Sequence, residues 1–405
     1  MHKVNKIIYL TTYLDQDLSK EFDMAHSEAG LIKKNQLIRV LEKNFDLKLV
    51  FTAVFTRIPG KIIPVNIVPL SQHTSLHIPC ILTVPILNYI INPFSVFLTI
   101  RNLIKNDKSA TTIIIYNLTY ENVMPALLLK LFFNVLIITQ YEDGINPNFG
   151  PMKKFIARFV EKVGLKITST FITNSRVAIK KFEEKGFFLF RGVCDKVQRS
   201  LLRGGSLIDP QSNLIKIVFS STLDETRGIN LLISLLENAN SSVLIENVKF
   251  IICGKGTEKK FCDVVSAVDI YRRKGGAADF KGFISQKELQ DVSTEADIFL
   301  NLQDPSHEFS KNSFPSKIFD YLLYDRPIIS TKVSDLQQDD LFKTINFIDA
   351  DWESLQERIL IVAGSIDTYI EHNSNNFMNL QRNFSSDKVA HDLLEFIDLK
   401  ISYKM

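Results

Sequence analysis

Runs of β-branched and apolar residues alternate with segments of helical periodicity along this chain, and the alternation occurs twice. In the first half, residues 6–14, 111–116 and 134–141 have the composition of buried strands. Segments of helical periodicity, such as residues 31–43, lie between the strand-like runs. Because parallel strands need long, usually helical connections, this order predicts a doubly wound parallel α/β sheet.

The same alternation starts again at residue 216, which predicts a second sheet of the same kind. Between the two halves, residues 203–213 are rich in Gly, Ser, Pro and Asn, as expected of a linker. A length of 405 residues also favours two domains over one. We therefore expect one Rossmann-like domain over residues 1–205, a second over 206–385, and a C-terminal helix over 386–405.

Charge and cysteine content exclude several classes of function. The net charge of +3 is too small to indicate a nucleic-acid-binding protein. None of the four cysteines has the spacing of a zinc site or a redox motif, so we expect no bound metal. Reduced thiols, and a start without the apolar core of a signal peptide, predict a cytoplasmic protein.

Two apolar runs raise the question of membrane helices. Residues 79–100 contain three prolines, and residues 124–139 are shorter than the ~20 needed for a span. We therefore expect a buried helix and strand in each place. Residues 152–166 form a basic amphipathic pattern that could rest on an inner membrane surface of anionic lipid, or could be a solvated helix face over a core.

Ligands of parallel sheets bind beyond the carboxyl ends of the strands, so the loops after strand-like runs carry the candidate site. After residues 216–220 come the small Ser221 and Thr222, and then Arg227 near a helix start, where a phosphate can bind. The alternative for Arg227 is an exposed arginine in a turn.

Two further loops follow later strands. Gly254-Lys255-Gly256 permits a tight turn against a flat ligand. In the loop of Gly282, Phe283 and Ile284, backbone amides could recognise the edge of a base, although an ordinary strand–turn–helix connection would look the same.

The last candidate stretch combines a proline and a lysine at the start of an apolar helix. Asn312, Ser313 and Phe314 precede Pro315, which a helix tolerates in its first turn. The remaining free N–H groups would face a diphosphate, with Lys317 as a point charge beside them. Asp320, one turn on, could bind a sugar hydroxyl or pair with Lys317.

In order and spacing, "FSSTLDETRGINLL", "VKFIICGKG", "ADFKGF" and "FPSKIFDYLLYDRPIIST" resemble the donor-binding domain of GT-B glycosyltransferases, family 4 in particular. The resemblance covers residues 216–336. It implies two Rossmann-like domains whose parallel sheets face a central cleft, with a C-terminal helix that could cross back to the first domain. It also implies retaining, metal-independent sugar transfer in surface polysaccharide synthesis, from a UDP- or GDP-sugar to a glycan or lipid-linked acceptor.

The resemblance assigns roles to the candidate residues. Arg227, Lys317 and Asp320 would be catalytic, with the two cations on the diphosphate and Asp320 on donor hydroxyls. The remaining donor-binding positions would be Ser221, Thr222, Gly254, Lys255, Gly256, Gly282, Phe283, Ile284, Asn312, Ser313 and Phe314. Gly30, Glu142 and Asp143 would lie on the acceptor side, although Asp143-Gly144 also suits a solvated turn.

Two positions depart from the family pattern. The first loop lacks the arginine often present there, and Asn312 and Asp320 stand where members often carry two glutamates. Asn312 is neutral and cannot act as a base. The alternatives are a catalytically degenerate partner subunit, or a nucleotide-sugar epimerase of GT-B shape that would use Glu142, Asp143 and His307. A nicotinamide dehydrogenase is disfavoured, because the glycine fingerprint of that class is missing.

Overall fold

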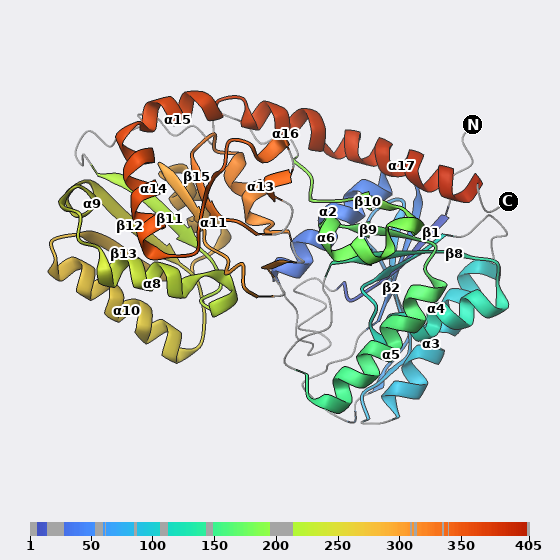
Figure 1. Cartoon of the computed structure of the whole chain (residues 1–405). Coiled ribbons are helices and arrows are strands. Elements are labelled where there is room, and N and C mark those ends of the chain that lie inside the picture. Colours follow the sequence, from blue (N-terminus) through green and yellow to red (C-terminus); the bar gives the residue numbers. More distant parts are fainter. Residues whose placement is uncertain are drawn as a thin grey trace. The chain divides into compact units, whose positions relative to one another are not determined.

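The computed structural model describes residues 6–13, 28–52, 60, 62–84, 87–105, 112–142, 149–194, 214–307, 310–311, 314–333, 336–338 and 340–402. The chain divides into two compact units (Figure 1). Unit 1 comprises Met1–Val193 and Ser386–Met405, and unit 2 comprises Cys194–Ser385. The predicted linker at 203–213 lies outside the described residues.

Unit 1 is built on an eight-stranded sheet in the order β10-β9-β8-β7-β1-β2-β5-β4. The strands are β1 (Lys6–Thr11), β2 (Asp46–Phe51), β4 (Asn66–Pro69), β5 (Thr74–Ile78), β7 (Thr112–Tyr116), β8 (Leu136–Tyr141), β9 (Thr170–Thr173) and β10 (Phe187–Leu189). All neighbours pair in parallel except β4 and β5. A separate antiparallel pair joins β3 (Ile62–Ile63) to β6 (Ile81–Leu82). The inner strands are buried on both faces, as their continuous apolar sequences predict.

Three helices cover one face of this sheet: α3 (Asn88–Lys105), α4 (Tyr120–Phe132) and α5 (Pro151–Ile167). Their buried residues share one core cluster with strand residues such as Ile113 and Ile137. Pro93 and Pro125 lie inside α3 and α4. After β9 the chain forms α6 (Arg176–Ile179) and then a 3-10 helix, η1 (Lys180–Lys185), with a non-helical residue at Phe182.

The C-terminal helix α17 (Ser386–Ser402) belongs to unit 1, where it packs on α2 (Glu28–Glu42). Just after α2, the Lys43 ammonium lies 2.5 Å from the Asp387 carboxylate, and the Asn44 side chain donates to the carbonyl of Ala390. Figure 1 shows α17 as the long terminal helix. The expectation that the C-terminal helix crosses back to the first domain is confirmed.

Unit 2 has a six-stranded, wholly parallel sheet in the order β13-β12-β11-β14-β15-β16. Its strands are β11 (Ile215–Ser220), β12 (Val248–Cys253), β13 (Ala277–Gly282), β14 (Ile298–Asn301), β15 (Ile328–Thr331) and β16 (Asn346–Ile348). The helices are η2 (Glu225–Arg227), α8 (Ile229–Asn238), α9 (Ser242–Asn247), α10 (Glu258–Arg273), α11 (Gln286–Thr294), α13 (Lys317–Leu322), η3 (Leu336–Gln338), η4 (Asp340–Phe342), α14 (Trp352–Gly364), α15 (Ile366–Asn373) and α16 (Asn376–Phe384). Two core clusters, one containing α8, α10 and α14 residues and the other α13 residues, enclose the sheet.

The apolar runs at 79–100 and 124–139 form the predicted helices and strands, but they are not wholly buried. Ile90 and Phe94 in α3, and Leu131 and Phe132 at the end of α4, are exposed. Within the described part of the chain, no helix combines the length and the apolar character that crossing a membrane requires.

Candidate functional site

Three of the predicted loops lie side by side at the carboxyl edge of the unit 2 sheet. After β11, the N–H of Ser221 donates to the Cys253 carbonyl over 3.0 Å, and the N–H of Leu223 donates to the Lys255 carbonyl over 2.8 Å. The N–H of Gly254 in turn donates to the Gly282 carbonyl over 2.8 Å. These backbone bonds hold the loops after β11, β12 and β13 in a fixed order beyond the strands.

The protein backbone itself requires Gly254 and Gly256. Gly254 has φ +155°, and a Cβ placed on it would lie 1.8 Å from the Ser221 carbonyl oxygen. A Cβ on Gly256 would lie 2.6 Å from the Leu223 carbonyl oxygen. The glycine pair was predicted to form a turn against a ligand, whereas in the structure the close neighbour of both glycines is the loop after β11.

Arg227 is placed by a tightly fixed turn. The Asp224 carboxylate accepts hydrogen bonds from the Arg227 N–H and the Thr226 hydroxyl. Gly228 follows in the left-handed region (φ +80°), where a Cβ would lie 1.6 Å from the Leu302 carbonyl oxygen. Arg227 therefore ends η2 and precedes α8 by one residue, with its half-buried side chain at the carboxyl edge of the sheet.

Lys317 reaches the same edge from α13. Its ammonium donates to the Ser220 carbonyl at the end of β11, and the Tyr321 hydroxyl donates to the same oxygen over 3.4 Å. Burial first, and then the Arg227 guanidinium, lower the pKa of Lys317, Asp320 opposes both effects, and the resulting pKa is about 8. Lys317 and Arg227 are thus close enough to repel each other.

Asp320 lies one turn after Lys317 on α13. Its own surface is exposed to solvent, yet the surrounding protein removes enough water to raise the pKa of its carboxyl, while Lys317 acts in the opposite direction. The edge therefore combines two cations with a carboxyl that loses its proton less readily than an ordinary aspartate.

Other positive groups surround this pair. Burial raises the pKa of the Cys253 thiol, the charges of Lys281 and Lys317 oppose this effect, and the resulting pKa is about 11. Both lysines therefore act on the carboxyl end of β12. The Lys255 ammonium lies 4.8 Å from the ring centre of Phe283, whose side chain is 62% exposed. The structure thus brings together two residues predicted separately to bind a donor, as a cation on an accessible aromatic face.

The helix entrance differs from the sequence-based expectation. The helix was predicted to begin at Phe314-Pro315, but α13 begins at Lys317 and has six residues. The N–H groups of Ile318 and Phe319 already donate to the carbonyls of Pro315 and Ser316. These N–H groups are therefore not available to a diphosphate. At this position the charge of Lys317, rather than the end of the helix, is the group that could bind one.

Several predicted donor residues have other surroundings or cannot be placed. The Phe314 side chain is buried, with its ring 5.6 Å from that of Phe342, so only its backbone could meet a ligand. Ser221 and Ile284 are half-buried, and Thr222 is exposed. Asn312 and Ser313 lie outside the described residues.

At the carboxyl edge of the unit 1 sheet lies a buried polar network. The Tyr9 hydroxyl donates to the Gln140 side-chain oxygen, and the Gln140 amide donates to the Glu142 carboxylate over 2.6 Å. The N–H of Glu142 donates to Asn117 over 2.9 Å. Burial and the nearby Glu142 charge raise the pKa of Tyr9, so the hydroxyl stays protonated and can donate.

Of the acceptor-side predictions, only Glu142 is placed in this network. Asp143 lies outside the described residues, and Gly30 lies in the first turn of α2. A second polar group lies at the same edge, where the Lys34 ammonium donates to the Thr12 hydroxyl and lies 4.7 Å from the Tyr116 ring centre.

Sequence reasoning missed Tyr321, Tyr9 and Gln140. Tyr321 was assigned no role, although it follows Asp320 directly. Gln140 stands two residues before Glu142 at the carboxyl end of a predicted strand, which is a signal the sequence does contain. No local pattern connects Tyr9 to Gln140, because the contact depends on strand order.

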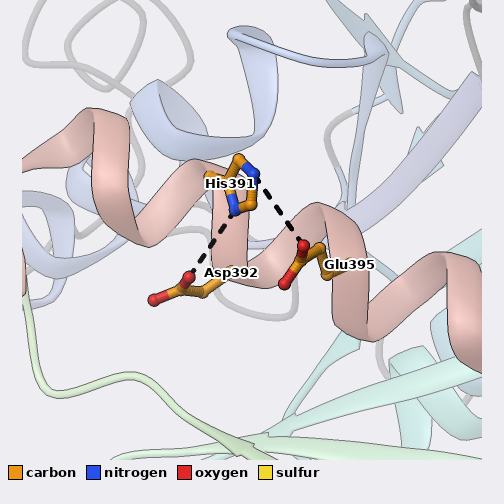
Figure 2. A group of neighbouring side chains, drawn as sticks. All are labelled: His391, Asp392 and Glu395. Carbon is orange, nitrogen blue, oxygen red and sulfur yellow. Dashed lines mark ion pairs between the residues drawn. The ribbon is translucent and has the colours of Figure 1, made fainter.

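One group of possible metal ligands occurs among the described residues: His391, Asp392 and Glu395 on α17 (Figure 2). The His391 ring nitrogens lie 3.7 Å from the Asp392 carboxylate and 3.8 Å from that of Glu395. Asp392 also pairs with Lys388 over 2.6 Å. Since the three residues are neighbours on one helix, and His391 and Glu395 are exposed, ordinary surface ion pairing explains the group.

No known protein family matches the chain, and no curated protein matches its sequence. Solved structures do match. Sucrose-phosphate synthase from Thermosynechococcus elongatus has a TM-score of 0.66 at 13% identity, over 98% of this chain and 100% of that chain. Alr3699/HepE of Anabaena, in complex with UDP and glucose, has a TM-score of 0.64 at 13% identity, over 97% of this chain and 99% of that chain.

The catalytic domain of starch synthase IV from Arabidopsis thaliana, bound to ADP and acarbose, has a TM-score of 0.64 at 10% identity, over 99% of this chain and 100% of that chain. These likenesses extend over both units. Together with the two parallel Rossmann-like sheets, they show that the chain has the GT-B fold. The predicted fold class is therefore confirmed.

Proposed function

We propose that the chain is a glycosyltransferase that moves a sugar from a nucleoside-diphosphate sugar, with UDP or GDP as the nucleotide, to a glycan or lipid-linked acceptor. The observation that supports it best is the pair of cations at the carboxyl edge of the unit 2 sheet. Lys317 and Arg227 repel each other, and Lys317 is also partly desolvated. A diphosphate between them would relieve both costs, because a bound anion favours the charged form of each side chain.

In this proposal the diphosphate is the leaving group. Lys317 and Arg227 stabilise the negative charge that develops on it, which is the task a metal performs in other enzymes, so no metal is needed. Asp320 accepts hydrogen bonds from donor sugar hydroxyls. Transfer proceeds with retention of configuration, and the activity serves surface polysaccharide synthesis.

The base of the nucleotide would lie on the loops after β12 and β13. Lys255 and Phe283 offer it a cation and an exposed aromatic face, and the backbone of Gly282 to Ile284 offers amides. Because Gly254 and Gly256 have no side chains, their loop can pack closely against the loop that contains Ser221 and Thr222. Ser313 and Phe314 would contribute backbone groups, and Asn312 would face the sugar.

The structural neighbours support the donor class. The Anabaena structure contains UDP and glucose, and the starch synthase structure contains ADP and acarbose. A nucleotide at the carboxyl edge of a parallel sheet also follows the general rule for such folds.

The acceptor side would be unit 1, with Glu142, Asp143 and Gly30. The buried network of Tyr9, Gln140 and Glu142 holds one carboxylate in a fixed orientation, as needed to position an acceptor hydroxyl. The protein would act in the cytoplasm, in peripheral contact with the inner face of the membrane where a lipid-linked acceptor lies.

A thermal-shift screen with UDP, GDP, CMP and dTDP tests the donor site, because a ligand that binds only the folded protein raises its melting temperature. We expect UDP or GDP to raise the melting temperature of the wild-type chain and to have little effect on Lys317→Ala. Lys287→Ala, an exposed lysine on α11, is the matched control and should respond as the wild type does. No shift with any of the four nucleotides would overturn the proposal and favour a degenerate partner subunit.

Product analysis separates transfer from epimerisation. Incubation with the donor alone should leave the sugar unchanged, apart from slow hydrolysis, and adding an acceptor should consume it. An epimerised nucleotide sugar formed without acceptor would show the alternative reaction instead.

A further inference from the structure

The helices α3, α4 and α5 form a single layer on one face of the unit 1 sheet. Their inward side chains, including Val96, Val123 and Val160, belong to one core cluster with the strands. α4 packs against both α3 and α5, and Figure 1 shows the three helices together over the sheet. Their outward side chains therefore point away from the same face of the sheet.

The outward side of α3 is apolar. Ile90, Ile91, Phe94 and Leu98 are all exposed, with Ile90 at 69%. Their spacing places them along one stripe of the helix, and the buried residues Pro93, Val96, Phe97 and Ile100 occupy the opposite side. A helix that only covers a core would carry polar residues on this stripe.

The outward side of α5 has the same character. Met152, Phe155, Ile156 and Phe159 follow the spacing i, i+3, i+4, i+7 and are exposed, Phe155 at 70%. Leu131 and Phe132, at the end of α4, are each 69% exposed. We call these ten residues of α3, α4 and α5 the apolar face.

Exposed large hydrophobic residues are concentrated on the apolar face rather than scattered over the surface. Of the 23 large hydrophobic residues exposed in the described part of the chain, twelve lie on these three helices or at the adjoining Leu87. Exposed apolar residues gathered on one helix layer usually mark an interaction site.

Charge identifies the kind of partner. The three helices carry eight basic and two acidic residues, whereas the whole chain has a net charge of only +3. On α5, Arg158, Lys162 and Lys166 are exposed and lie along one flank of the apolar stripe. A second copy of the chain on this face would place the like-charged flanks of the two copies together, which is unfavourable.

We propose that the apolar face is a docking surface for the surface of an anionic lipid bilayer. The aromatic and aliphatic side chains enter the boundary between headgroups and acyl chains, and the basic side chains of α5 reach the phosphates beside them. The proposal deepens the membrane contact included in the proposed function. It has its own test, because lipid binding is measured without donor, acceptor or transfer.

Vesicle co-sedimentation of the full chain tests the surface. The vesicles are phosphatidylcholine with and without about a third of phosphatidylglycerol, at low and physiological ionic strength. Phe155→Ser/Phe159→Ser removes two exposed rings, and Arg158→Gln/Lys162→Gln removes two charges. Val243→Ser/Met378→Ser, exposed apolar residues of unit 2, is the matched control.

We expect the wild type to bind the anionic vesicles, and the Phe155/Phe159 double variant to bind at least about tenfold more weakly. The charge variant should lose about tenfold on anionic vesicles and little on neutral ones. The control should bind as the wild type does. All four proteins should show the same melting temperature, since each changed side chain is on the surface.

Three results would overturn the proposal. One is a folded wild-type chain that does not bind anionic vesicles. Another is binding that the Phe155/Phe159 variant retains in full, or that is equal on neutral vesicles and insensitive to the charge variant. The third is a wild-type dimer, seen by light scattering, that the Phe155/Phe159 variant dissociates, since the face would then join two copies of the chain.

Discussion

The two units share one plan, but the carboxyl edges of their sheets differ in chemistry. In unit 2, the positively charged side chains of Arg227 and Lys317 lie near each other at partly accessible positions and repel each other. In unit 1, Tyr9, Gln140 and Glu142 are buried and satisfy one another through hydrogen bonds. The edge of unit 2 holds two like charges close together, as the proposed anionic ligand would require, whereas the polar groups at the edge of unit 1 already bond to one another.

The outer helix layers differ as well. On the unit 2 helix α10, charged side chains pair within the protein, as in Lys260 with Glu225 and Arg272 with Asp279. On the unit 1 layer, apolar side chains take the place of such pairs. The same position in the architecture thus serves as a solvated surface in one unit and as a candidate docking surface in the other.

The largest effect expected from a single change is that of Gly228→Ala, because the loops of unit 2 leave no room for a side chain. A Cβ there would lie 1.6 Å from the Leu302 carbonyl oxygen, and φ is +80°. We expect a loss of about 4 kcal/mol or more in the free energy of unfolding of unit 2. Trp352, the only tryptophan of the chain, lies in unit 2, and its fluorescence in urea reports this transition.

Two other glycines sharpen this comparison. Gly164→Ala in unit 1 would meet only the side chains of Leu118 and Val123, which can shift, so the Trp352 transition should not move. Gly364→Ala on α14 of unit 2 would meet nothing within 4 Å and should not destabilise the unit. A Gly228→Ala protein with an unchanged Trp352 transition would show that the turn before α8 adapts.

The next largest effect is on turnover. Lys317→Ala removes one of the two cations of the unit 2 edge, and we expect turnover to fall by about a hundredfold to a thousandfold. Lys287→Ala should leave turnover unchanged. Near wild-type turnover of a folded Lys317→Ala protein would remove Lys317 from the proposed mechanism.

The features of the fold and the site that could be predicted from the sequence are those that depend on short-range patterns. A strand was predicted directly before Gly254, and β12 does end at Cys253, because apolar runs bounded by a glycine turn are a short-range pattern. The order of the unit 2 loops could also be predicted, and the structure places Arg227, Gly254 and Lys317 at one edge of the sheet. Parallel topology alone brings them together.

Other features depended on contacts between distant residues. Gly254 looked like a ligand-binding glycine, but the constraint comes from the Ser221 carbonyl, 33 residues earlier in the sequence. The start of α13 could not be read from Pro315, because proline is tolerated both inside and just before the first turn. The α5 part of the apolar face was anticipated in the amphipathic pattern of residues 152–166, but its α3 and α4 parts were expected to be buried, because exposed and buried apolar stripes look alike in a sequence until the packing partner is known.

Two tyrosine variants, one in each unit, should have smaller effects on the free energy of unfolding. Tyr9→Phe removes the buried donor to Gln140 and leaves the amide oxygen unsatisfied, which should cost unit 1 about 2 kcal/mol in the free energy of unfolding. Tyr321→Phe removes only a 3.4 Å bond to a carbonyl that Lys317 also satisfies, and should cost unit 2 little. Hydrogen exchange of β1 and β8 peptides measures the first, and Trp352 fluorescence the second. Equal losses in the free energy of unfolding of the two units would contradict the contrast between the hydrogen-bonded edge of unit 1 and the charged edge of unit 2.

The smallest effect expected is the pH dependence of nucleotide binding, which tests the charged edge of the unit 2 sheet directly. The pKa of Lys317 is lowered to about 8, so between pH 7 and pH 9 the free protein loses the proton that an anionic ligand requires. If the bound diphosphate keeps Lys317 charged, the dissociation constant for UDP or GDP should rise about tenfold over this range. Calorimetric titrations at several pH values measure it. Lys317→Arg keeps a charge that does not titrate, so its affinity should stay level over the same range. An equally steep rise in Lys317→Arg would assign the pH dependence to another group.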